Sequence, residues 1–238
     1  MANETSSTDP SLNRRDALKL LAAGLVGMAP LPAPAVAKDS HESSGLFAIP
    51  NTGEDALSLL MNGNQRYLNQ ELTSCSANMA ELRKHSEAHQ EPFAAILSCA
   101  DSRVPVELVF DQTLGQLFVC RVAGNIATPD TIASLEYAAA AVGVKLILVV
   151  GHTNCGAVKA AAANKAVPGQ VSTLFQYIHP AVKNTPDLTE ASRKNAILQA
   201  ATFREASPVL AELVESKKLL IRAAVYDVSS GNVTLLDG

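Results

Sequence analysis

The sequence predicts an α/β fold: a mainly parallel central sheet of four or five strands flanked by helices, with a helical arm on its N-terminal side. Two wholly apolar runs, residues 93–97 and 146–150, have the composition of strands buried on both faces. Between them, apolar residues recur at helical spacing. With 238 residues and 47% hydrophobic content, the chain can bury the core of one such domain.

The N-terminal arm is expected as a helix over 53–70, capped by Thr52. Its apolar residues fall on one face: Leu57, Leu60, Met61, Tyr67 and Leu68. A second, mostly polar helix is expected over 78–89. It carries His85 and His89 four residues apart, which could hold a metal ion from one helix face, but no third ligand stands nearby in the sequence. Exposed surface histidines are the favoured interpretation.

The rest of the chain alternates strands with helices. The expected ranges are a strand at 93–97, a short helix at 105–110, a strand at 116–121, a helix at 129–142, a strand at 144–150, a helix at 156–165, a helical and looped segment at 168–187, a helix at 190–206, a helix ending near 217, and strands at 219–228 and 233–236. A Ser-Gly-Asn turn joins the last two strands, which are therefore expected to be antiparallel.

The first 37 residues resemble an export signal. Residues 13–19 carry two consecutive arginines in the manner of a twin-arginine signal, and the apolar stretch after them is shorter than the ~20 residues of a membrane span. Ala35-Val36-Ala37 has the small-x-small form of a cleavage site. This predicts a signal peptide at 1–37, a linker at 38–51 and one catalytic domain at 52–238, located in the periplasm. A disordered or anchoring tail is the alternative.

The charge of the chain narrows the range of partners. Its formal net charge is -4 and its pI is about 5.7, and no basic stripe appears along the sequence. A nucleic-acid partner would require such a stripe, so none is expected.

Two turns place metal-binding side chains after the two apolar runs. The first carries Cys99, and the second carries His152 and Cys155. If the strands are parallel, both turns lie at the carboxyl edge of the sheet, where α/β folds build their sites. Two thiolates and one imidazole are a typical ligand set for a catalytic Zn²⁺, which keeps a fourth position open. Cys155 also begins the next helix, which predicts a lowered pKa for its thiol.

Two charged residues accompany the first thiol. Asp101 lies two residues after Cys99, and Arg103 two residues further on, so in an extended turn their side chains point the same way. Asp101 can accept a hydrogen bond from a water molecule beside the metal, while Arg103 can hold that carboxylate with two parallel hydrogen bonds.

The four cysteines allow other interpretations. Disulfides are the usual use of cysteine in an exported protein, and a bridge from Cys75 to Cys120 stays open at this stage. The twin-arginine route carries folded proteins, so zinc could bind reduced thiols before export. A redox protein would require C-x-x-C, which is absent, and a cysteine phosphatase would require an arginine where Pro105 stands.

Three motifs together resemble the β-class carbonic anhydrases. They are Cys99-Ala100-Asp101-Ser102-Arg103-Val104-Pro105, Arg121-Val122-Ala123-Gly124-Asn125, and Gly151-His152-Thr153-Asn154-Cys155-Gly156-Ala157. Their order and spacing match the family, and the resemblance extends from about Ser58 to the C-terminus. It implies the same α/β fold and a zinc enzyme that converts carbon dioxide and water to bicarbonate and a proton.

The resemblance also implies roles for individual residues. Cys99, His152 and Cys155 would hold the zinc ion. Asp101 would orient the reacting water, or fill the fourth zinc position in a closed state, with Arg103 keeping it ionised and aimed. Gln90, nine residues before Cys99, would donate an amide hydrogen bond to the substrate. The subunits would pair as a homodimer or a dimer of dimers, with the helix at 53–70 reaching over a partner.

The resemblance leaves some alternatives open. A bicarbonate-inhibited subtype carries tryptophan where Ile96 stands, so the constitutively open subtype is expected. Hydrolysis of carbon disulfide or carbonyl sulfide would use the same ligands, and a zinc-stabilised module without activity would lack Asp101 or Arg103, which are both present. His179 and Tyr177 are candidates for proton transfer by chemistry alone.

The ligand set predicts that carbon dioxide hydration is fastest at mildly alkaline pH. Two thiolates cancel the charge of Zn²⁺, whereas three histidines leave it at +2, so water at this site should lose its proton less readily. The rate, followed by stopped flow, should rise from about pH 6 into the mildly alkaline range. A rate that is already maximal at about pH 6 would contradict the prediction.

Overall fold

A five-stranded sheet forms the centre of the computed structural model, which describes residues 49–165 and 167–237. The strands lie in the order β2-β1-β3-β4-β5, with bounds β1 Ala94–Ser98, β2 Leu117–Arg121, β3 Leu146–His152, β4 Leu220–Tyr226 and β5 Val233–Leu236. The first four are parallel and β5 is antiparallel to β4. The predicted fold class is therefore confirmed. The expected signal at 1–37 and most of the linker lie outside the described residues.

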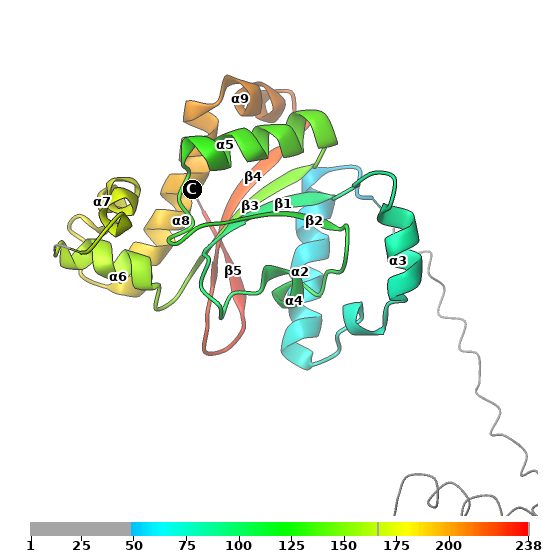
Figure 1. Cartoon of the computed structure of the whole chain (residues 1–238), viewed down its shortest axis with the longest axis horizontal. Coiled ribbons are helices and arrows are strands. Elements are labelled where there is room, and N and C mark those ends of the chain that lie inside the picture. The colour runs from blue at the N-terminus through cyan, green and yellow to red at the C-terminus, as the bar shows by residue number, and fades with distance from the viewer. Residues whose placement is uncertain (1–48, 166, 238) are drawn as a thin grey trace, which may run out of the picture. The chain divides into compact units, whose positions relative to one another are not determined.

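Helices cover both faces of the sheet (Figure 1). One face packs against α5 Pro129–Glu136, the π-helical turn η3 Tyr137–Val142, α8 Leu188–Ala206 and α9 Pro208–Glu215. The other face packs against α2 Gly53–Asn69 and α4 Val106–Val109. Successive strand residues alternate between the two faces, so both sets must be apolar. This is why the runs at 93–97 and 146–150 contain no polar residue.

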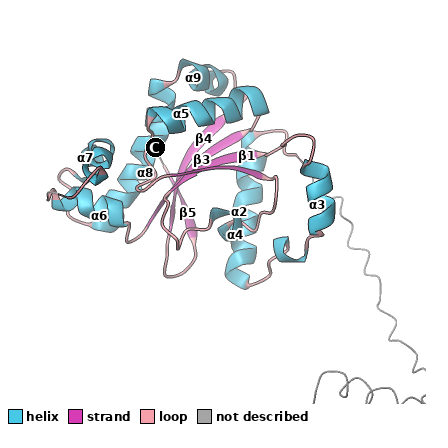
Figure 2. Ribbon diagram, in the orientation of Figure 1, coloured by secondary structure: helices cyan, strands magenta, loops and turns pink. Residues whose placement is uncertain are grey.

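Other helices lie around this layered centre, as Figure 2 shows by secondary structure. They are the 3₁₀ turn η2 Ser74–Ser76, α3 Met79–Ser86, α6 Gly156–Ala163, the 3₁₀ turn η4 Val171–Leu174 and α7 Phe175–Val182. Buried residues of α6 and α7 form a smaller apolar cluster that includes Cys99 and Cys155. Both thiols therefore lie in an apolar surrounding at the carboxyl edge of the sheet.

Two expected helices differ from the structure. The polar helix α3 ends at Ser86 rather than near 89, so His89 lies beyond it and contacts Glu91 at 2.9 Å. His85 and His89 therefore do not share a helix face, and both are exposed. The helix expected over 129–142 is α-helical only to Glu136, and a π-helical turn follows before Gly143 ends it with a φ of 91°.

Asn64 fastens α2 to the sheet. Its side chain is fully buried and donates hydrogen bonds to the carbonyls of Val109 and Gly231, at 3.1 and 3.0 Å. It also accepts one from the amide of Val233 at 2.9 Å. One buried amide thus ties together the arm helix, α4 and the β4–β5 hairpin, because each of these backbone groups would otherwise be left unpaired.

Among the described helices, none has both the length and the apolar composition that crossing a bilayer requires.

Candidate metal centre

Three predicted ligands meet at the carboxyl edge of the sheet. Cys99 directly follows β1, His152 ends β3, and Cys155 is the cap residue before α6. The parallel pairing places Ser98 opposite Val150, so both turns leave the sheet at the same edge. The sulfurs of Cys99 and Cys155 lie 4.0 Å apart, and the three ligand atoms are within 4.8 Å of one another.

These side chains fit a zinc ion. Two ligands bound at ~2.3 Å to one tetrahedral ion would lie about 3.8 Å apart, close to the sulfur separation found here. All three residues are buried, with exposed fractions of 4%, 0% and 3%. Nδ1 of His152 lies 2.9 Å from the carbonyl oxygen of Thr153 and can donate to it, which leaves Nε2 as the ring nitrogen with a free lone pair. That Nε2 is buried and has no hydrogen-bond partner among the described residues.

The two thiols do not ionise independently. A hydrogen bond from Cys155 lowers the pKa of Cys99 to about 4, against the opposing effect of burial, with help from His152 and the amide of Gly124. The pKa of Cys155 is raised, chiefly by the Cys99 side chain and by burial, although the amides of Ala157 and Val158 at the start of α6 lower it. The expected lowering at Cys155 is therefore wrong for the metal-free chain, since its neighbour outweighs the helix terminus.

Asp101 and Arg103 form the predicted pair beside the ligands. Nε and Nη2 of Arg103 donate to the two carboxylate oxygens at 2.9 and 2.8 Å, and its backbone amide adds a bond to Oδ1 at 3.0 Å. These bonds, chiefly from the Arg103 side chain, hold the pKa of Asp101 well below its usual range. Oδ2 of Asp101 is 3.9 Å from Nε2 of His152. Since Oδ2 accepts only one of these bonds, it keeps a lone pair for a further donor.

Arg121 supports this site in a way that the sequence reasoning missed. Its Nε donates to the carbonyl of Cys99 at 3.0 Å and its Nη2 to the carbonyl of Asp101 at 2.6 Å. It therefore fixes the turn from which both functional side chains project. The register of the parallel strands β1 and β2 is what indicates this role of Arg121. In that register Arg121 is paired with Ser98, the residue before Cys99.

Gln90 is not near the three ligands in this chain. It is exposed and precedes β1, whereas Cys99 follows the same strand, so the two lie at opposite ends of β1. Its role at the substrate stays a prediction. His179 and Tyr177, the proton-transfer candidates, lie on α7, where His179 is exposed.

The other two cysteines take no part in the cluster. All four are free, so the Cys75–Cys120 bridge is not formed. Cys75 is exposed in η2, and burial raises the pKa of the half-buried Cys120 on β2.

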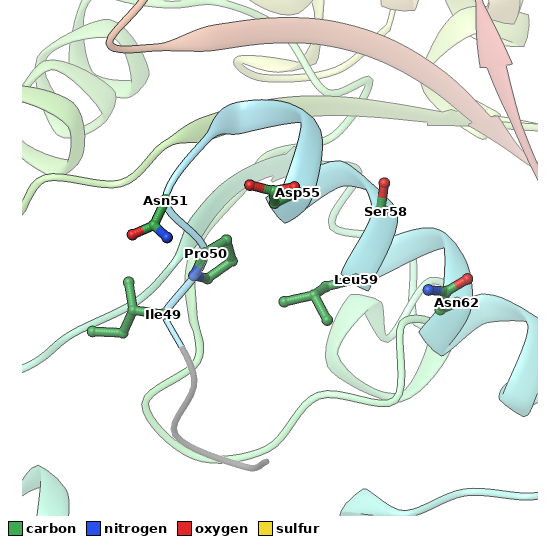
Figure 3. A pocket seen from close by; sticks show the side chains of 7 residues that line it. All are labelled: Ile49, Pro50, Asn51, Asp55, Ser58, Leu59 and Asn62. Carbon is green, nitrogen blue, oxygen red and sulfur yellow. The ribbon is translucent and has the colours of Figure 1, made fainter. Parts of the chain in front are cut away.

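A hollow of about 370 Å³ lies elsewhere, on the outer side of α2 (Figure 3). Ile49, Asp55 and Leu59 are among its lining residues, and none of the three metal ligands is.

Comparison with known proteins gives one consistent result. A family model described as carbonic anhydrase matches residues 94–233. Carbonic anhydrase 2 of Mycobacterium tuberculosis is 32% identical over 199 residues, covering 79% of this chain and 96% of that protein. A carbonic anhydrase of Pseudomonas aeruginosa is 35% identical over 177 residues, covering 67% and 80%.

Solved structures agree with the sequence relatives. The β-carbonic anhydrase CafA of Aspergillus fumigatus superposes with a TM-score of 0.62 at 25% identity, covering 77% of this chain and 91% of that chain. A Coccomyxa β-carbonic anhydrase in complex with acetazolamide gives 0.61 at 25% identity, covering 76% and 86%.

The geometry predicts one zinc ion per chain. Cys155→Ser should abolish zinc binding, because a serine hydroxyl is a poor zinc ligand and leaves only two strong ones. Elemental analysis of the purified proteins measures this directly. Cys120→Ser is the matched control, since it removes a half-buried thiol from the same sheet outside the cluster, and it should keep its zinc. Wild-type protein without zinc, or a Cys155→Ser variant that retains it, would contradict the assignment.

Proposed function

The chain belongs to the β-class carbonic anhydrases, and from that membership we propose how its own residues divide the work of the reaction. The enzyme catalyses the reversible hydration of carbon dioxide to bicarbonate and a proton. The observation that carries this function is the meeting of Cys99, His152 and Cys155 within 4.8 Å. Zinc held by three histidines lowers the pKa of bound water from ~15.7 to about 7; held by these two thiolates and one imidazole it would lower that pKa less, and would supply a nucleophile at mildly alkaline pH.

The apolar cluster around the cysteines protects the ligands from bulk water. Ile126, Val158 and Phe175 are buried in the same cluster as Cys99 and Cys155. Water is therefore kept from the sulfurs, and the hydrogen bonds and charges at the site act in a surrounding of low polarity. Carbon dioxide is itself apolar, so this surrounding disfavours the substrate less than it disfavours ions.

Asp101 is the proposed acceptor for the reacting water. Oδ2 of Asp101 lies 3.9 Å from Nε2 of His152 and keeps a free lone pair. It can therefore accept a hydrogen bond from the reacting water and fix the orientation of that water. Because Arg103 keeps Asp101 ionised, this carboxylate acts as an acceptor and not as an acid at working pH. The two hydrogen bonds from Arg103 also support the open subtype, since they hold the carboxylate of Asp101 on the guanidinium.

Asp101→Asn should lower kcat/KM for carbon dioxide hydration by about 10²-fold or more while zinc stays bound. The amide keeps the shape of the side chain but loses the charge and the firm link to Arg103. Stopped-flow hydration assays together with elemental analysis measure both quantities, with chelator-treated wild type as the zero-activity reference.

Asp130→Asn is the control for this change, because Asp130 is an exposed carboxylate in the first turn of α5. A rate for Asp101→Asn within about twofold of this control would reject the proposed role of Asp101.

A second subunit is the proposed source of Gln90. Within one chain, Gln90 lies at the end of β1 opposite to the ligands, so it can serve the substrate only from another copy. This favours a homodimer, alone or as half of a dimer of dimers, in which α2 reaches over the partner. The hollow lined by Ile49 and Leu59 on the outer side of α2 supports this, since these exposed apolar side chains would be covered by a contact (Figure 3).

Mixing two inactive variants tests the shared site. Gln90→Ala should lose substrate binding, and Cys155→Ser should lose zinc. A mixed dimer places an intact Gln90 from one chain beside an intact ligand set from the other, so one of its two sites works. Random re-pairing of equal amounts should restore about a quarter of wild-type activity. If mixing restores no activity although mixed dimers form, Gln90 does not act across subunits.

Export is a further part of the proposal. The twin-arginine-like segment and the Ala35-Val36-Ala37 site support a periplasmic enzyme whose mature chain begins near Lys38. Fractionation of the producing cells and mass spectrometry of the intact protein test this. A cytoplasmic protein that retains residues 1–37 would reject it.

A further inference from the structure

The loop after β2 brings a backbone amide onto one of the zinc-binding sulfurs. The amide of Gly124 donates to Sγ of Cys99 at 3.3 Å. Gly124 has a φ of 82°, and a Cβ there would lie 2.7 Å from Cδ1 of Ile178. The left-handed conformation therefore favours glycine at this position, and a Cβ would also displace the end of the Ile178 side chain. The amide can reach the sulfur only while the loop keeps this path.

Two buried amides on α8 hold that loop. Nδ2 of Asn195 donates to the carbonyl of Gly124 at 2.8 Å. Oε1 of Gln199 accepts from the amide of Ala127 at 2.8 Å, and its Nε2 donates to Oδ1 of Asn195 at 3.0 Å and to the carbonyl of Tyr177 at 2.9 Å. The loop is thus held at two points three residues apart.

The side-chain amides of Asn195 and Gln199 are fixed both in position and in the direction of their oxygen and nitrogen atoms. Asn195 and Gln199 are 0% and 1% exposed, and they lie four residues apart on one face of α8. Exchanging the oxygen and nitrogen of Gln199 would set its NH₂ against the amide of Ala127 and its oxygen against the carbonyl of Tyr177. Only one orientation of each side chain therefore pairs donors with acceptors.

We propose that Asn195 and Gln199 are positioning residues of the zinc centre, which act by holding the Gly124 amide against Sγ of Cys99. This rests on the proposed function, since it concerns how the same site is tuned. A hydrogen bond to a thiolate withdraws electron density from the sulfur, so the sulfur donates less charge to the metal. That effect opposes the charge cancellation by two thiolates and favours ionisation of the bound water.

The test compares two buried asparagines. Asn195→Leu removes the donor to Gly124. Asn64→Leu removes an equally buried asparagine that holds α2 and contacts none of the ligands, so it controls for lost stability. In protein loaded with Co²⁺ in place of zinc, the thiolate-to-metal charge-transfer band should move to lower energy in Asn195→Leu, because the sulfur lone pair is no longer stabilised. Because the loop would then no longer hold the Cys99 side chain in its ligating orientation, transfer of zinc to a chelator should also become about 10- to 100-fold faster.

Asn195→Asp gives a second variant if leucine prevents folding. It keeps the size of the side chain and an oxygen for the bond from Gln199, but it sets a carboxylate oxygen against the Gly124 carbonyl. The same two changes are expected. A conserved band and zinc transfer within about twofold of Asn64→Leu in both variants would overturn the positioning role. Absence of any thiolate-to-cobalt band in wild type would instead overturn the metal centre itself, and the positioning role with it.

Discussion

The parallel pairing of β1 with β3 is the constraint on which the site depends. It places Ser98 opposite Val150, so ligands more than fifty residues apart in sequence leave the sheet at one edge. Two thiols and an imidazole then share a buried space, with the Arg103 guanidinium as a cation that interacts with both thiols. In the metal-free chain the pKa of Cys99 is lowered and that of Cys155 is raised, chiefly because of the hydrogen bond between the two side chains, with burial and the Cys99 charge adding to the rise at Cys155. A divalent cation held by both sulfurs would balance two thiolate charges, so metal binding and ionisation of these ligands are coupled.

Two arginines beside the ligands hold different parts of the first turn. Arg103 donates to the carboxylate of Asp101 and to the carbonyl of Asn154, whereas Arg121 donates to the carbonyls of Cys99 and Asp101. Arg103 therefore keeps the carboxylate of Asp101 ionised, and Arg121 fixes the backbone that carries it. This division leaves Oδ2 of Asp101 directed at the site, since neither its charge nor its position depends on the reacting water.

Helix α8 joins packing and chemistry in one element. Its apolar residues cover a face of the sheet, while Asn195 and Gln199 reach the loop between β2 and α5. A buried amide without a hydrogen bond raises the free energy of the folded state. These two side chains therefore specify one loop path more strictly than apolar contacts would. The position of α8 therefore determines, through the loop, where the Gly124 amide lies relative to Sγ of Cys99.

The sequence by itself determined the fold class, the three ligands and the Asp101–Arg103 pair. Apolar runs without polar residues predict strands buried on both faces, and short motifs at the ends of such strands need only local spacing to be recognised. The tertiary structure decided what depends on contacts between distant segments: the place of Arg121 on the first turn, the raised pKa of the Cys155 thiol, and the position of Gln90 away from the ligands of its own chain. These features follow from register and burial, and neither can be obtained from local patterns, because each depends on which segments become neighbours in space.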